Sequence, residues 1–78
     1  MNLSKLRVGE NAVIKDIHAE EGIRQRLRAM GLRSGREARL IRCAQLGGPL
    51  QIRVGSVTLI IRRSDAERIS VSPVPSHA

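Results

Sequence analysis

The chain has 78 residues, a formal net charge of +7, one cysteine and no Phe, Trp or Tyr. This length suits one domain, which buries only about 60–65% of the surface that the unfolded chain exposes. A single cysteine excludes an internal disulfide, and no stretch approaches the ~20 apolar residues of a membrane-spanning helix. The first nine residues lack the apolar run of a signal peptide, and a lone cysteine fits a reducing, cytoplasmic compartment.

The first predicted strand covers residues 11–18, although its apolar side chains do not alternate in one clear phase. A helix is predicted over residues 20–30, with an apolar stripe at i, i+4 and i+7. The stripe consists of Ile23, Leu27 and Met30. Gly31 is expected to end the helix in a left-handed conformation, with Leu32 packing back onto Leu27.

A second strand is predicted over residues 36–44. Its apolar residues change phase after Leu40, which indicates a bulge or bend at a barrel corner. Cys43, near its end, is expected to be a small buried hydrophobe. Residues 45–49 contain two glycines and a proline and are predicted to form a turn.

A β-hairpin over residues 50–62 is the clearest element. Its apolar residues alternate on both sides of Gly55-Ser56, a two-residue connection typical of a type II′ turn. Such a turn fixes the register and pairs Val54 with Val57, Ile52 with Leu59 and Leu50 with Ile61. All six side chains are expected on one face, where they would form most of the core. Ile60 is the apolar exception on the opposite face.

Beyond the hairpin, Ser64 to Glu67 follow a capping-box pattern that predicts one helical turn. A last short strand is predicted over residues 69–71. We therefore expect a mostly β fold, a small five-stranded barrel with one inserted helix, because closure removes exposed strand edges. The domain is predicted over residues 1–72, with a disordered tail at 73–78.

No set of residues predicts catalysis. A catalytic site needs a nucleophile with a base, paired carboxylates or a metal. The serines fall in turns, caps or terminal segments, and His18 is the one imidazole outside the predicted tail. Asp16, His18 and Glu20 form at most an underfilled cation site. We predict no catalytic residue, no metal site and no cofactor.

The positive charge is concentrated in one segment. Residues 23–42 carry seven arginines and one acid, whereas residues 1–22 carry a small net negative charge. A basic segment suggests an acidic partner. The absence of aromatic residues excludes the stacking platforms with which small barrels bind single strands and the aromatic grooves that bind proline-rich peptides. Binding to duplex nucleic acid through arginine stays open, although we do not expect it.

The ordered series of residues resembles a known family. The series comprises Leu3, Leu6 and Gly9; Arg26-Leu27, Met30-Gly31-Leu32 and Gly35; Ala44 to Pro49; and Leu59 to Arg62, Ala66, Ile69 and Val71. Together these residues resemble the ferrous iron transport protein A (FeoA) family of bacteria, over roughly residues 3–71. The chain departs from the family at Gln45, where proline is frequent, and at Gly48, where an acid is common.

The resemblance implies a Src-homology-3-like barrel and a non-enzymatic, cytoplasmic accessory role in ferrous iron transport. It also implies a partner, the cytoplasmic GTP-binding domain of a membrane iron transporter. A similar barrel forms the C-terminal domain of metal-dependent transcriptional repressors, which is the alternative assignment alongside a basic nucleic-acid-binding module.

Two candidate partner-binding surfaces follow from these observations. The basic segment, represented by Arg24, Arg28, Arg36 and Arg39, is expected to form one face toward an acidic surface. The competing surface is the loop before the hairpin, represented by Leu46, Gly48 and Pro49.

Overall fold

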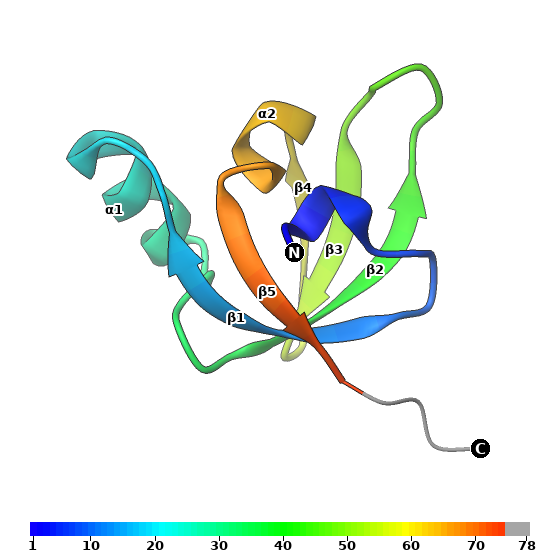
Figure 1. The fold of residues 1–78 in the computed structure, drawn as a ribbon, viewed down its shortest axis with the longest axis horizontal. Coiled ribbons are helices and arrows are strands. Elements are labelled where there is room, and N and C mark those ends of the chain that lie inside the picture. The colour runs from blue at the N-terminus through cyan, green and yellow to red at the C-terminus, as the bar shows by residue number, and fades with distance from the viewer. Residues whose placement is uncertain (75–78) are drawn as a thin grey trace.

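Residues 1–74 are described by the computed structural model, in which a short 3₁₀ helix precedes five strands and two α-helices. In chain order the elements are η1 (Leu3–Lys5), β1 (Asn11–Ile17), α1 (Glu21–Ala29), β2 (Glu37–Cys43), β3 (Leu50–Val54), β4 (Val57–Ile61), α2 (Arg63–Ala66) and β5 (Ile69–Pro73). The strands form one antiparallel sheet in the order β4-β3-β2-β1-β5, which curls around the core (Figure 1).

The hairpin of β3 and β4 has the predicted register. Val54 lies opposite Val57, and the ladder continues to Leu50 opposite Ile61. Gly55 has a φ of 62°, as the first central residue of a type II′ turn requires, whereas Ser56 is not in the left-handed region. The turn and the alternating apolar residues therefore specify the same pairing.

Two register shifts explain the irregular phases of the other predicted strands. One lies in β2 between Leu40 and Arg42, where a bulge was expected. The other lies in β1 between Ile14 and Asp16, which separates the buried pair Ala12 and Ile14 from buried Ile17. An extra residue on one strand shifts the side-chain alternation by one position.

The six hairpin side chains do not all enter the core, contrary to the prediction. Val57 is 51% exposed and Leu59 is partly buried, because β4 is an edge strand with β3 as its single neighbour. The core is completed by residues from the other elements, including the fully buried Leu3, Ile14, Leu27, Leu32, Leu40 and Ile69. Leu3 lies in η1, an element that the sequence pattern did not reveal.

The end of α1 forms a Schellman motif. The Leu32 N–H donates to the Leu27 carbonyl oxygen at 3.1 Å, and the Gly31 N–H donates to the Arg28 carbonyl oxygen at 2.9 Å. Gly31 has a φ of 105°, and both Leu27 and Leu32 are buried. The predicted left-handed cap is thus confirmed, and Leu27 and Leu32 belong to the same buried core cluster.

Gly31→Val is expected to lower the free energy of unfolding by about 1–3 kcal/mol, because a β-branched residue resists a positive φ. The space is open, with no heavy atom within 4 Å of a Cβ at position 31, so the cost is one of backbone conformation. Gly22→Ala is the matched control: it also adds a Cβ in open space, but inside α1, and should stabilise by about 0.5–1 kcal/mol. Thermal unfolding measures both, and changes of the same sign would contradict this account.

The C-terminal elements differ from prediction at their ends. α2 begins at Arg63, so Ser64 lies inside the helix, and its N-cap Arg62 makes no side-chain capping bond. The predicted capping box is therefore wrong. β5 continues to Pro73, and the Val74 N–H donates to the Asn11 carbonyl oxygen, so the predicted tail loses its first residues to the sheet. The rest of that tail, residues 75–78, lies outside the described residues.

Across residues 1–74, neither α1 nor α2 has the length and apolar character needed to cross a membrane.

Candidate interaction surface

Arg39 and Arg53 lie on the outer face of the sheet, and Arg36, the residue before β2, reaches the β3–β4 turn; we call these three residues the arginine cluster. Arg39 on β2 lies directly opposite Arg53 on β3, on the face away from the buried Ala38. The Arg36 guanidinium lies against the β3–β4 turn, 2.9 Å from the position that a Cβ on Gly55 would occupy. Within residues 1–74 none of the three makes an ion pair.

The other two predicted arginines do not join this cluster. Arg24 is half-buried on α1, and its guanidinium lies 3.7 Å from the Glu21 carboxylate, whereas Arg28 is exposed. The helix is tied to the end of β4 that is remote from Gly55, because Arg26 contacts Asp65 of α2 at 3.4 Å. The structure therefore divides the predicted basic face into two groups, the arginine cluster and the helical pair Arg24 and Arg28.

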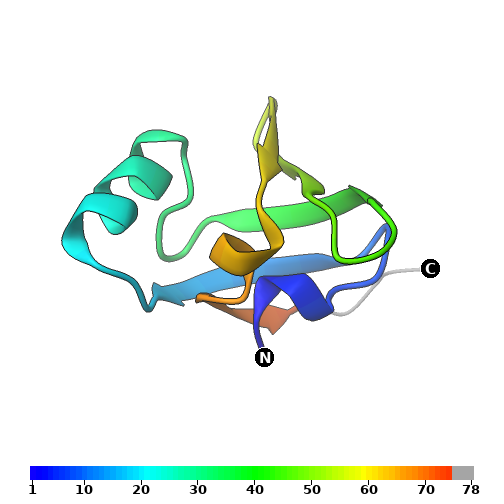
Figure 2. The same cartoon turned by 90° about the horizontal axis from the view of Figure 1, so that it is seen from above.

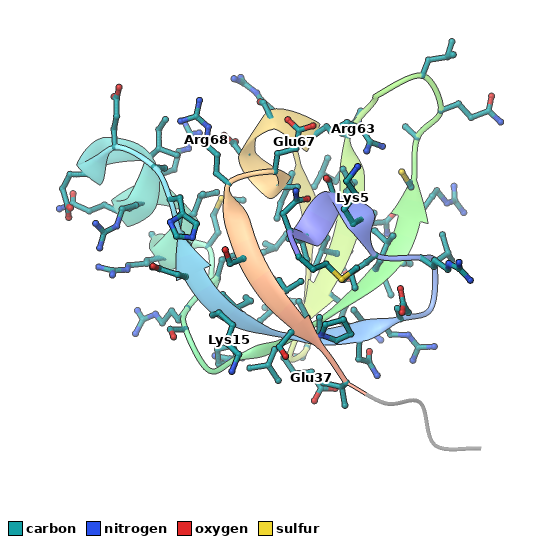
Figure 3. All side chains as sticks on the ribbon, in the orientation of Figure 1. Lys5, Lys15, Glu37, Arg63, Glu67 and Arg68 are labelled. Atoms are coloured by element: carbon teal, nitrogen blue, oxygen red, sulfur yellow. The ribbon has the colours of Figure 1, made fainter. Side chains whose placement is uncertain are left out.

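The loop between β2 and β3 is a separate surface at the opposite end of β2. In Figure 3, Glu37 lies at the start of β2, whereas Arg63 lies near the opposite end of the same strand, beside Cys43. Leu46 is fully exposed and has a φ of 58°, a left-handed conformation that is unfavourable for a leucine by about 1–2 kcal/mol. The loop thus presents an apolar side chain to solvent on a strained backbone.

The backbone of this loop is tightly closed. The Ala44 N–H donates to the Pro49 carbonyl oxygen at 3.0 Å, and the Gly48 N–H donates to the Gln45 carbonyl oxygen at 3.2 Å. A Cβ on Gly48 would lie only 2.7 Å from the Ala44 Cβ. Gly48 thus allows a close approach within the loop, and Leu46 and Pro49 are both exposed.

Sequence reasoning missed one contact near this loop. The Arg63 guanidinium donates to the Cys43 thiol, with Nη2 3.0 Å from Sγ. Cys43 is only partly buried, not enclosed in the core as predicted. No local pattern links residues 43 and 63, because the order of strands β2, β3 and β4 brings α2 beside the end of β2.

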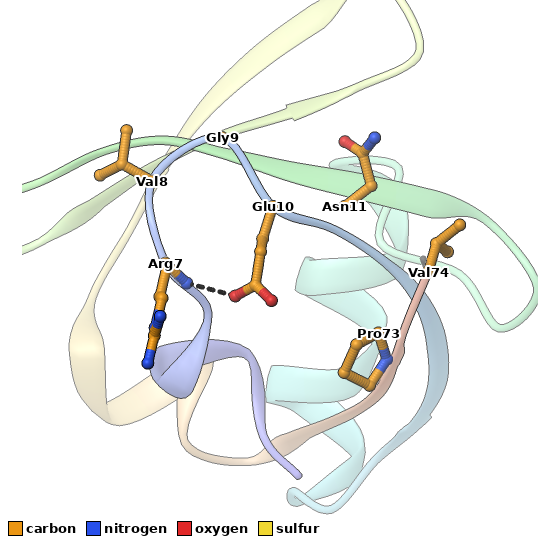
Figure 4. Close-up of a pocket in the computed structure, with 7 residues that line it drawn as sticks. All are labelled: Arg7, Val8, Gly9, Glu10, Asn11, Pro73 and Val74. Carbon is orange, nitrogen blue, oxygen red and sulfur yellow. Dashed lines mark hydrogen bonds between the residues drawn. The ribbon is translucent and has the colours of Figure 1, made fainter. Parts of the chain in front are cut away.

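An open hollow lies between the turn before β1 and the end of β5 (Figure 4). Its one acid, Glu10, is used structurally: the carboxylate accepts a hydrogen bond from the Arg7 backbone N–H at 2.7 Å. The Gly9 N–H and the Leu40 N–H also form hydrogen bonds that hold this turn against β2. None of the predicted site residues lines the hollow.

His18, considered above as a weak cation ligand, is exposed and directly follows β1. Its Nε2 lies 2.8 Å from the Ser70 hydroxyl, and its Nδ1 lies 3.9 Å from the Asp16 carboxylate. In the described part of the chain, no three His, Cys, Asp or Glu side chains are grouped as a metal site would need.

Comparison with known proteins gives one family and several close relatives. The FeoA domain model matches residues 1–73. A fusion protein of Fe(2+) transport protein A and Fe(2+) transporter FeoB from Porphyromonas gingivalis is 33% identical over 78 residues. The match covers 100% of this chain but only 9% of the fusion protein.

Solved structures agree with this match. The FeoA protein from Chlorobium tepidum superposes with a TM-score of 0.90 at 33% identity, covering 100% of this chain and 74% of that one. FeoA from Stenotrophomonas maltophilia, an SH3 domain protein complexed with zinc, has a TM-score of 0.79 at 34% identity, covering 92% and 89%. The predicted SH3-like fold is thereby confirmed.

The fold is also shared more widely. A manganese-dependent transcriptional repressor superposes with a TM-score of 0.86 at 17% identity, over 95% of this chain and 41% of that one. At this identity the likeness concerns the fold alone.

Proposed function

Since the chain belongs to the FeoA domain family, we propose that it is an accessory protein of bacterial ferrous iron uptake. It binds the cytoplasmic GTP-binding part of a membrane Fe(2+) transporter and modulates that transporter, without catalysing a reaction itself. We place it in the cytoplasm, recruited to the inner face of the membrane by its partner. One observation carries the proposal: in the Porphyromonas gingivalis relative, an A domain and the transporter are parts of one polypeptide.

The charge distribution supports an acidic partner surface. The formal net charge is +7, and the arginine cluster holds three guanidinium groups that lack acidic partners within residues 1–74. Like charges directly opposite each other on neighbouring strands, such as Arg39 and Arg53, destabilise a sheet. An acidic partner surface would relieve this repulsion and would orient the encounter.

The test of this function is an uptake experiment. Ferrous iron uptake is measured in cells that carry the transporter with its own accessory chain, without that chain, and with the chain restored. We expect uptake to fall without the chain and to recover with it, and the purified chain to bind the purified cytoplasmic part of the transporter. Uptake that does not depend on the chain would overturn the proposal.

The loop surface gives a second prediction. Leu46→Asp is expected to weaken binding to the cytoplasmic part of the transporter at least about tenfold, because a charge replaces an apolar contact residue. Titration calorimetry measures the affinity. Val8→Asp is the matched control, because Val8 is also an exposed apolar residue in a turn, outside both candidate surfaces. Equal affinities of the two variants would exclude the loop as a contact.

A further inference from the structure

The strand β4 has a free edge. Among residues 1–74 it pairs with β3 alone, and β5 is the strand at the opposite edge of the sheet. The two-residue turn is closed by hydrogen bonds between Val54 and Val57, and the bonds of an antiparallel ladder alternate along the strand. The N–H and C=O groups of Val57, Leu59 and Ile61 therefore point toward β3, and those of Thr58 and Ile60 point away from the sheet.

This edge lacks three features that commonly protect an edge strand from pairing. Natural edges carry charges, prolines or bulges, yet residues Val57–Ile61 contain none of these, and their pairing with β3 is regular. Apolar side chains are also exposed on both faces of the edge: Val57 is 51% exposed on the core side, and Ile60 is 71% exposed on the outer side. A further strand beside β4 would cover both.

The edge forms one wall of a groove. It is lined by Ile60, Ile61 and Arg62 at the end of β4, by Arg26 and Leu27 of α1 with its C-cap Met30, and by Asp65 of α2. Figure 2 shows α1 and the β3–β4 hairpin rising from the same side of β1 and β2. Because Asp65 already contacts Arg26, Arg62 is the charged residue of this groove that has no ion-pair partner among residues 1–74.

We propose that β4 accepts an extended segment of the transporter's cytoplasmic part as a sixth strand. The proposal rests on the function proposed above and adds the mode of binding. The segment would carry apolar side chains against Leu59 and Ile60 and acidic side chains near the two ends of β4. Arg62 follows one end, and Arg53 lies opposite Thr58 near the other. Main-chain hydrogen bonds supply affinity in this mode, and the flanking side chains supply specificity.

Charge argues against a second copy of this chain as the occupant. Two copies would each bring a net charge of +7. Antiparallel pairing of one β4 with another would also bring Arg62 of each copy toward the β3–β4 turn of the other, where the Arg36 guanidinium lies. An acidic segment meets no such repulsion.

The experiment removes one outward N–H and leaves the β3–β4 ladder intact. Thr58→Pro deletes a donor on the free edge, a position at which an edge strand tolerates proline. Thr58→Ala is the matched control, because it removes the same exposed side chain and keeps the N–H. We expect Thr58→Pro to weaken binding of the purified cytoplasmic part at least about tenfold, and Thr58→Ala to change it less than about twofold. Hydrogen exchange on the complex should show protection of the Thr58 and Ile60 amides.

The outcomes separate the two proposals. If uptake requires the chain, but Thr58→Pro and Thr58→Ala bind equally well and the two amides stay unprotected, strand addition is wrong and the accessory function stands. If the wild-type chain neither binds nor affects uptake, both proposals fail. If sedimentation of the chain alone shows a dimer that Thr58→Pro abolishes, the occupant is a second copy and the proposal is overturned. Thermal unfolding of each variant checks that the fold is retained.

Discussion

Replacing Leu3 with alanine is expected to lower the free energy of unfolding by about 2–5 kcal/mol, the usual cost of truncating a buried leucine. Leu3 is fully buried although it is the third residue of the sequence. It is held there by η1, whose N-cap Asn2 accepts a hydrogen bond from the Ser4 N–H and forms a β-bridge with Ser70. Because small domains are stable by only about 5–15 kcal/mol, this loss is large.

Val8→Ala is the control for the Leu3 variant. Val8 belongs to the same N-terminal segment, but it is 65% exposed, so its truncation should change stability by less than about 0.5 kcal/mol. Urea unfolding followed by circular dichroism measures both variants. A cost below about 1 kcal/mol for Leu3→Ala would mean that the N-terminal segment contributes little to the core.

The elements with two independent local signals were predictable from the sequence. The β3–β4 hairpin combines a glycine-containing two-residue turn with strict alternation, and both specify one register. The end of α1 combines a glycine with a returning leucine, and the Schellman motif appears where predicted. In each case the determinants lie within a few residues of one another.

The elements that depend on distant partners were not predictable in the same way. η1 spans three residues, too few to show a period, and its burial depends on contact with α2 and β5. The exposure of Val57 depends on β4 being the edge strand, and the alternation of apolar residues along the sequence does not indicate which strand lies at the edge. Alternation assigns a residue to a face, and only the strand order determines whether that face is covered.

In the candidate site, too, some features follow from the local sequence and others depend on the fold. The concentration of arginine in residues 23–42 is evident from the sequence, but its arrangement in space is not. Arg53, which lies outside that segment, belongs to the arginine cluster because β3 pairs with β2. Arg24 and Arg28 lie outside the cluster because they belong to α1, which an ion pair between Arg26 and Asp65 links to α2. Proximity in sequence therefore grouped residues that the fold separates.

Reversing Arg39 and Arg53 together to glutamate is expected to slow association with the cytoplasmic part of the transporter by about 10- to 1,000-fold at low salt. Electrostatic steering accelerates encounter by factors of this size, and the effect should shrink as salt increases. The pair Arg39→Glu and Arg53→Glu keeps like charges opposite each other across β2 and β3, so the stability of the sheet should change little. Stopped-flow mixing at two salt concentrations measures the rate constants.

The matched control is the double variant Arg24→Glu and Arg28→Glu. Both double variants lower the formal net charge from +7 to +3, so long-range attraction weakens equally and any remaining difference reflects position. If the outer face of the sheet meets the acidic surface, the Arg39 and Arg53 variant should associate at least about tenfold more slowly than this control. Equal rates would show that net charge alone steers the encounter. A slower control would place the acidic surface on α1, beside the groove that β4 borders, and would move the contact from the arginine cluster to the helical pair.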